Sequence, residues 1–188
     1  MIEFSLMTAE EFVDRRLDWD DIRPWSELVK GHVKSFEQPD EAHGLTLLNF
    51  SKALGQYLMQ LETGYACFDM GLVTARDPDT VRFTPCCIFS AGPRFAEMDK
   101  PVTDSVPQAA LEVASTSDRR NSMRERVLEY LDWGIEVVWV ADPQAEMVHT
   151  FRPGQPIDML NRDSILTGGE TLAGFEVPVG ELFVSSKH

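Results

Sequence analysis

The sequence is poor in cysteine and has no cysteine spacing typical of a metal site or a disulfide framework. Its three cysteines, Cys67, Cys86 and Cys87, include no CxxC pair, and their odd number argues against a set of disulfides. We therefore expect reduced thiols in a cytoplasmic protein. Cys86 and Cys87 would point to opposite faces of a strand, so we interpret both as small apolar residues.

The chain also lacks a long apolar run. No segment approaches the roughly 18 consecutive apolar residues that mark a membrane-spanning helix. The opening MIEFSLMTAEEF has no basic region followed by an apolar stretch, which is the pattern of a signal peptide. The sequence thus predicts neither a membrane partner nor a secretory leader.

Cations are scarce as well. Lys and Arg total 17 against 31 Asp and Glu, which gives a formal net charge of −14. Because sequence-independent DNA affinity comes from neutralised phosphates, this balance argues against tight metal-free binding of nucleic acid. A local basic groove or a bound divalent cation could still reverse the field at one site.

What is present is a globular pattern with alternating helix and strand signals. A hydrophobic content of 43% in 188 residues suffices for one core, so we expect one domain over 1–188, with its core at about 25–152. Capping, turn and periodicity signals predict an α/β protein. The predicted helices are 8–17, followed by an acidic turn at 18–21, then 45–61, stopped by Gly64, and one opened by a capping box at Ser122–Glu125 and ended by Gly134. The predicted extended segments are a hairpin over 25–36, strands 66–74, 81–89, 106–114 and 136–141, a hairpin partner at 147–152, and a turn-rich tail over 168–183.

Glu112 is the first candidate for chemistry. Its carboxylate lies between Leu111 and Val113 on an apolar strand, where it is costly without a partner, a metal ion or an open cleft. The alternative is a glutamate that points to solvent on the alternate face of the strand.

A cluster of arginines follows one loop later and could neutralise phosphate or pair with Glu112. Its members are Arg119, Arg120, Arg124 and Arg126. The alternative is a solvated basic face on an acidic protein. Arg126 also shares a helical stripe with Tyr130 and Trp133, so its stem could lie along aromatic rings.

Several segments in order carry a family resemblance. They are TAEEF near the start, ELVKGHV (27–33), ALEVAS (110–115), YLDWGIEVVWVADP (130–143) and the closing LAGFEVPVGELF. With them the chain resembles the Uma-two family, bacterial proteins classed as restriction endonucleases of the PD-(D/E)XK superfamily. The resemblance implies a restriction-endonuclease-like α/β core, with a mixed central sheet flanked by helices.

The resemblance also implies a site that holds Mg²⁺ or Mn²⁺ between an Asp on one strand and a Glu on the next, with a Lys assisting the attacking water. Glu112 matches the strand glutamate, and Glu27 matches an acidic residue that supports the metal. Cys86, after Pro85, stands where the Asp is expected, and Arg126 stands where the family has Lys. Two further matches are supporting ones: Gln108, at a frequent second Pro-Asp, and His43, which either lies near the cleft or caps and packs its helix.

These departures predict a degenerate site. A thiol or thiolate is a poor ligand for a hard cation, and Arg126 could clamp phosphate but cannot act as a base. Asp69, Asp77 or Asp79 could replace the missing ligand from the adjacent hairpin.

Three functions remain open from the sequence. The first is a nuclease-like protein with degraded catalysis that acts as a binding or regulatory module. The second is a working metal-dependent DNA endonuclease with a migrated ligand, and the third is a protein-association scaffold. Duplex-acting relatives of this fold favour a homodimer, and nothing indicates a small-molecule cofactor.

Overall fold

The computed structural model describes residues 6–18, 25–90, 95–97 and 99–185. Their helices are α1 (Ala9–Asp18), α2 (Glu41–Leu58), α3 (Ser117–Trp133) and α4 (Val179–Leu182). Their strands are β1 (Ser26–Val29), β2 (His32–Ser35), β3 (Tyr65–Ala75), β4 (Thr80–Phe89), β5 (Val102–Thr103), β6 (Ala109–Val113), β7 (Val137–Asp142), β8 (Met147–Phe151), β9 (Asp158–Leu160), β10 (Ile165–Gly168) and β11 (Leu172–Pro178). None of these helices is long and apolar enough to cross a membrane.

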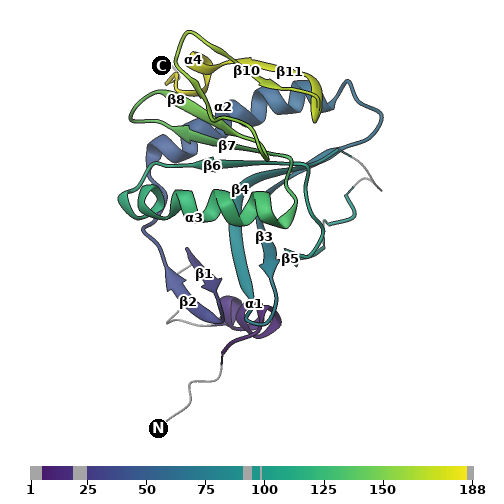
Figure 1. Cartoon of the computed structure of the whole chain (residues 1–188), viewed down its shortest axis with the longest axis vertical. Helices are drawn as coiled ribbons and strands as arrows, with labels where there is room; N and C mark the ends of the chain where they lie inside the picture. Colours follow the sequence, from purple (N-terminus) through teal and green to yellow (C-terminus); the bar gives the residue numbers. More distant parts are fainter. Residues whose placement is uncertain (1–5, 19–24, 91–94, 98, 186–188) are drawn as a thin grey trace.

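A mixed sheet of nine strands forms the centre of the molecule (Figure 1). Its main path runs β2-β1-β4-β6-β7-β8-β9, while β3 pairs with β4 and with the short β5. β6 and β7 are parallel and are joined through α3, whereas the hairpins β1–β2, β3–β4 and β7–β8 are antiparallel. The predicted α/β class and mixed sheet are confirmed.

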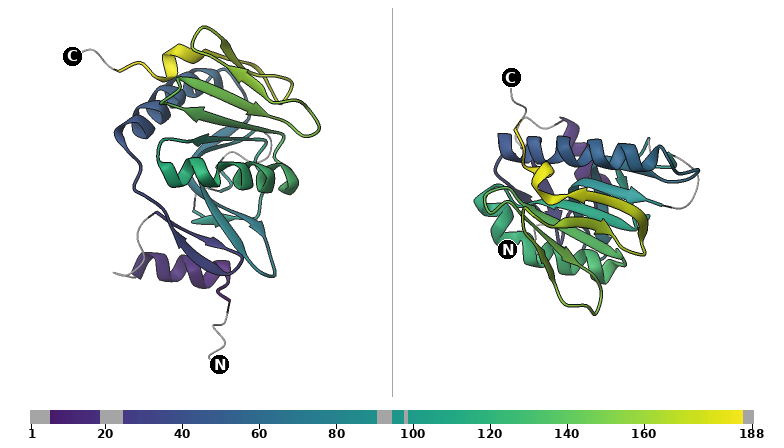
Figure 2. Two further views of the ribbon diagram at one scale, coloured as in Figure 1. Left: turned by 60° about the vertical axis from the view of Figure 1, so that its left-hand side comes forward. Right: turned by 90° about the horizontal axis from the view of Figure 1, so that it is seen from above.

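The central strands are apolar on both faces because each face is covered by a helix. Residues 109, 111 and 113 of β6 pack against α2 residues Phe50 and Leu54, and the β10–β11 hairpin and α4 complete that core. On the other face, Ala110 of β6 packs with Tyr130 and other residues of α3. Figure 2 shows α2 and α3 on opposite sides of the sheet. The alternation of side chains along β6 therefore decides which helix each one meets.

Strand β4 changes partners along one edge, and this change creates the site. β1 meets β4 at Val81, and β6 meets it only from Cys86 onwards. On its other edge β4 pairs with β3 along almost its whole length. The stretch 82–85 is thus left between β1 and β6 without a strand partner on that edge. Its backbone groups need hydrogen bonds from elsewhere.

The starts of α2 and α3 differ from the predicted ones, whereas α1 begins at the predicted capping box of Thr8 and Glu11. α2 starts at Glu41, four residues before the predicted start, because the side chain of Asp40 caps it by accepting from the His43 N–H at 2.9 Å. It ends at Leu58, so the predicted stop at Gly64 is wrong. The capping box at Ser122 is also wrong, since α3 begins at Ser117.

The remaining differences are small. The Ser122 hydroxyl donates to the Arg119 carbonyl inside α3 and does not cap a helix start. Gly134 ends α3 in the left-handed conformation, as predicted. The acidic turn at 18–21 lies outside the described residues except for Asp18, which is the last residue of α1.

Candidate functional site

A cavity of about 240 Å³ opens where β1, β3, β4 and β6 meet the first turns of α2 and α3. It brings together five residues that the sequence singled out, namely Glu27, Glu112, Arg119, His43 and Asp69. The other lining residues are Arg16, Trp25, Ser26, Pro39, Leu47, Phe68, Phe83, Pro85 and Val113. We call this cavity the site pocket.

Glu27 on β1 is the centre of the pocket wall and is fully buried. Its two oxygens each accept a bond of 2.6 Å from the Arg126 guanidinium. They also accept from Arg119 at 2.9 Å and from Arg82 at 3.3 Å. The backbone N–H of Phe83 donates to it at 3.2 Å. The Glu27 carboxylate therefore accepts hydrogen bonds from three guanidinium groups and from one backbone N–H of β4 that has no strand partner.

Arg126 on α3 is fully buried and reaches across the gap between β1 and β6. Besides its two bonds to Glu27, its Nη2 donates to the Phe83 carbonyl at 2.8 Å. Its Nε lies 3.0 Å from Glu112 Oε1, although the N–H is poorly aligned with that oxygen. The side chain thus bridges two carboxylates and takes the place of a missing ladder partner of β4.

Glu112 lies on the α3 side of β6 and is 1% exposed. The Tyr130 hydroxyl donates to its Oε1 at 2.8 Å, and Arg126 approaches the same oxygen. The alternative of a solvent-facing Glu112 is therefore wrong. This glutamate is a buried, paired carboxylate at the pocket wall.

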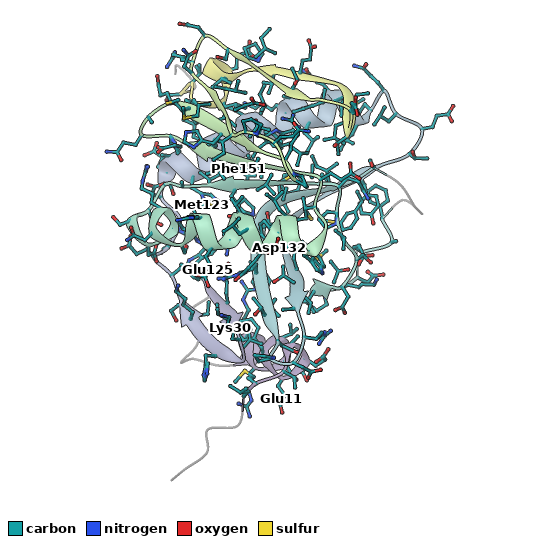
Figure 3. All side chains as sticks on the ribbon, viewed as in Figure 1. Glu11, Lys30, Met123, Glu125, Asp132 and Phe151 are labelled. Atoms are coloured by element: carbon teal, nitrogen blue, oxygen red, sulfur yellow. The ribbon has the colours of Figure 1, made fainter. Side chains whose placement is uncertain are left out.

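A second layer of charge lies behind these groups. Arg82 of β4, which is fully buried, makes two bonds of 2.7 Å with the carboxylate of Glu129 on α3. Glu125, labelled on α3 in Figure 3, is 3.9 Å from the same guanidinium and half-exposed. Three arginines (Arg82, Arg119, Arg126) and three glutamates (Glu27, Glu112, Glu129) thus form one network, which we call the Arg–Glu network.

The electrostatics of the network favour its charged form. Burial alone would raise the pKa of Glu27, but Arg126, Arg119 and Arg82 outweigh burial and lower it to about 2. Burial opposes the charge of Arg126, yet Glu112 and Glu27 hold the pKa of this guanidinium well above its ordinary value. Burial, with a contribution from Glu112, also raises the pKa of the Tyr130 hydroxyl. At neutral pH these groups form a charged, internally neutralised cluster with Tyr130 as a neutral donor.

Cys86 lies away from this cluster. Its side chain is fully buried on the α2 face, in the apolar core with Phe50 and Trp139. Burial raises the pKa of its thiol far above the ordinary value. It pairs across the sheet with Leu111. Because side chains alternate along a strand, Pro85 of β4 and Glu112 of β6 face the opposite side. Pro85 lines the site pocket and Cys86 does not.

Asp69 is the acidic residue of the β3–β4 hairpin that does reach the pocket. It is exposed at the rim, has a positive φ of 50°, and stands between the Phe68–Cys86 and Met70–Thr84 pairs, across from Pro85. Asp79 instead binds the backbone N–H groups of Ala9 and Asp77 at the α1 end of the hairpin.

His43 lines the pocket from the first turn of α2. Burial, and secondarily Arg119, lower the pKa of its imidazole. This shift favours the neutral imidazole, which can accept a proton. The cap of α2 is made by Asp40, so His43 does not cap this helix through its side chain.

The other predicted site residues are dispersed. Arg120 pairs with Asp142 at the end of β7. Arg124 is exposed and lines a different groove, beside Leu128 and Phe151. Gln108 accepts from the Ser90 N–H at 2.7 Å and lies away from the pocket. The predicted phosphate-binding arginines thus do not share one groove.

A protein-family model described as "Putative restriction endonuclease", Uma2, matches residues 9–180. The chain belongs to the Uma2 family. Its fold is similar to the crystal structure of a putative nuclease of DUF820 from Anabaena variabilis, with a TM-score of 0.76 at 16% identity, over 94% of this chain and 97% of that chain. No curated protein matches. The resemblance and the fold that the sequence predicted are confirmed.

The divalent cation expected at a Uma2 nuclease site does not fit the donors present in this chain. Glu27 and Glu112, the two buried carboxylates of the three that line the pocket, are both in contact with Arg126. The thiol that stands at the expected Asp faces the opposite core. Within the part of the chain that the structure describes, no three His, Cys, Asp or Glu side chains are grouped to hold a metal ion. Hard cations require anionic oxygens that are free to coordinate.

Sequence reasoning missed Arg82 and Glu129, which complete the network of this Uma2 protein. A signal for Arg82 was available, because it interrupts the apolar strand between Val81 and Phe83 as Glu112 interrupts β6. Glu129 had no such signal, since acidic residues are common on exposed helix faces.

Proposed function

We propose that this Uma2 protein has weakened or lost metal-dependent phosphodiesterase activity and acts as a binding or regulatory module. The observation that supports this best is the position of Arg126. Its guanidinium is fully buried, holds Glu27 with two bonds of 2.6 Å, and lies 3.0 Å from Glu112. A fixed organic cation thus neutralises the carboxylates that a metal ion would need.

Displacing Arg126 would be expensive. A divalent cation would have to break the bonds of Arg126 to Glu27 and to the Phe83 carbonyl while the guanidinium stays inside the protein. Breaking a buried ion pair leaves an unpaired charge and costs about 3–5 kcal/mol. Arg126 also cannot give up its proton, so it cannot replace a lysine that assists water.

The test is metal binding and cleavage by the whole chain. Isothermal titration with Mg²⁺ and with Mn²⁺ should show no micromolar binding, and neither supercoiled plasmid nor single-stranded DNA should be cleaved. Micromolar binding that disappears in Glu112→Gln, together with plasmid nicking lost in the same variant, would contradict the proposal. Glu176→Gln, an exposed position on β11, is the matched control and should behave as the wild type.

One observation favours the second candidate, an active endonuclease with a migrated ligand. Asp69 lines the same pocket as Glu112, on the strand beyond Pro85. If this candidate held, Asp69→Asn would abolish cleavage while Asp77→Asn, outside the pocket, would leave it unchanged. Under our main proposal neither the wild type nor Asp69→Asn nor Asp77→Asn cleaves DNA above the background of a buffer control.

DNA as a partner has weaker support than the loss of hydrolysis. Arg119 and Arg120 are already paired, with Glu27 and Asp142, and Arg124 lies on a different groove. The pocket has a volume of about 240 Å³ and is lined by the aromatic rings of Trp25, Phe68 and Phe83, which suits a small aromatic group better than a duplex. The predicted homodimer stays a prediction.

A further inference from the structure

Cys67 and Cys87 face each other across the β3–β4 hairpin. They are directly opposite in the antiparallel register, between the regular pairs Ala66–Ile88 and Phe68–Cys86. Directly opposite residues of an antiparallel pair have Cα atoms about 4.5–5.5 Å apart, with side chains on the same face. A disulfide needs Cα atoms at roughly 4.4–6.8 Å. The backbone therefore already has the spacing for a bridge.

The Cys67 and Cys87 thiols differ in their exposure to solvent and in the direction of their pKa shifts. Cys87 is fully buried, whereas Cys67 is half-buried and lines a second cavity of about 300 Å³, together with Glu97 and Lys100. The hydrogen bond from Cys87 lowers the pKa of the Cys67 thiol, against the opposing effects of partial burial and of Glu97. The same contact raises the pKa of Cys87. One accessible thiol is thus activated by its neighbour, and the neighbour keeps its proton.

We propose that Cys67 and Cys87 are a thiol oxidation site, in which Cys67 attacks a peroxide and Cys87 resolves the product into an intramolecular disulfide. In the first step the Cys67 sulfur attacks a peroxide oxygen, the O–O bond breaks, and an alcohol or water leaves with the Cys67 proton. In the second step the Cys87 sulfur attacks the resulting sulfenic acid, the S–S bond forms, the S–O bond breaks, and water leaves with the Cys87 proton. The two thiols lose two electrons, which the peroxide takes up.

Cys86 is the internal control for this site. It is next to Cys87 in sequence, fully buried, and directed into the opposite core. Burial raises the pKa of its thiol, so it is protonated and inaccessible. It should remain a free thiol while its neighbour is oxidised. The proposal does not depend on whether the Arg–Glu network excludes metal ions.

The experiment treats the folded, reduced chain with one equivalent of hydrogen peroxide and then alkylates it in denaturant. The wild type should fall from three free thiols to one and lose the mass of two hydrogens, and dithiothreitol should reverse both changes. Trypsin cuts after Arg76 and Arg82, which separates Cys67 from Cys87, so the bridge appears as a linked peptide pair.

Three single variants assign the bridge. Cys86→Ala should form it as the wild type does. Cys67→Ser should form no bridge, and Cys87→Ala should stop at a Cys67 sulfenic acid that dimedone labels. Circular dichroism checks that each variant is folded, and Cys67→Ser, at the half-buried position, keeps the test open if Cys87→Ala unfolds. Retention of all three thiols, a bridge to Cys86, or dimers linked through Cys67 would overturn the proposal.

Discussion

At the scale of a single residue, replacing Arg126 should have the largest effect on the stability of the site. Its removal leaves Glu27 and Glu112 buried with fewer counter-charges and leaves the Phe83 carbonyl without a donor. We expect Arg126→Gln to lower the free energy of unfolding by about 3–5 kcal/mol, measured by urea denaturation. Arg124→Gln, an exposed position on the same helix, is the matched control and should change it by less than about 0.5 kcal/mol.

Arg126→Gln also tests whether the Arg126 guanidinium occupies the position that a divalent cation would take. If Arg126 stands in for a cation, Mg²⁺ or Mn²⁺ should raise the melting temperature of Arg126→Gln and leave the wild type unchanged. An equal rise in both proteins would instead indicate a metal site elsewhere.

Glu27 predicts how stability depends on pH. The arginines hold the pKa of Glu27 at about 2 in the folded state, below its ordinary value of 4.5. A depressed carboxyl pKa stabilises the fold above the unfolded pKa, and this contribution is lost as pH falls through the folded one. The free energy of unfolding should therefore decrease between about pH 5 and pH 2. Glu27→Gln should remove much of that slope and lower stability at pH 7, and an unchanged slope would contradict the role of Glu27.

Restoring the aspartate that the family has at position 86 should not restore a metal site. Because the Cys86 side chain lies in the apolar core beside Phe50 and Trp139, Cys86→Asp would bury an unpaired carboxylate. We expect a loss of more than about 3 kcal/mol in unfolding free energy and no gain in Mn²⁺ affinity. Cys86→Ala should cost much less, and a stable Cys86→Asp that binds Mn²⁺ would show that the strand can turn this side chain towards Glu112.

The sequence identified the main residues of the site but not which of them contact one another. Glu112, Glu27 and Arg126 were found because a charge on an apolar strand, or a position in a family motif, marks them. That Arg126 bonds Glu27 could not be predicted, since the two lie 99 positions apart and meet only through the sheet order. The direction of Cys86 depends on register, and a shift of one residue reverses the face.

At the scale of secondary-structure elements, replacing two glycines with alanine should change the stability of the protein in opposite directions. Gly134 ends α3 with φ +116°, a conformation that other residues adopt at a cost. Gly55 lies inside α2, with nothing within 4 Å of an added Cβ. Gly134→Ala should lower unfolding stability by roughly 1 kcal/mol, and Gly55→Ala should raise it by about 0.5–1 kcal/mol. Thermal denaturation of both variants checks this, and the same sign for both would contradict the helix boundaries.

The long strands were predicted better than the starts of α2 and α3, for a physical reason. The buried runs of β4 and β7 show their apolar pattern directly in the sequence, so their ranges were close to the observed ones. A capping signal is a local pattern that also occurs inside helices. At Ser122 the hydroxyl bonds a carbonyl of its own helix, and the start lies five residues earlier, after Thr116. The tertiary position of α3 over the sheet decides where it begins.

At the scale of the whole molecule, the net charge of −14 opposes binding to DNA. With the arginines of the Arg–Glu network neutralised internally, we expect fluorescence anisotropy with a labelled duplex to show no saturable binding at roughly 150 mM salt. Weak binding that vanishes as salt rises would be consistent with contacts to exposed cations alone. A submicromolar dissociation constant at that salt would contradict this expectation and restore DNA as the main partner.

The sheet order also bears on how the molecule folds. Glu27 of β1 and Arg126 of α3 are far apart in sequence, and their contact requires β1 and β6 to be docked on β4 and the helical crossover to β7 to be closed. Each of these steps restricts a long loop before any ionic contact can repay it. The Arg–Glu network should therefore assemble after the folding transition state, and its removal should speed unfolding while leaving refolding almost unchanged. On this account the network determines the lifetime of the native state rather than the speed of its formation.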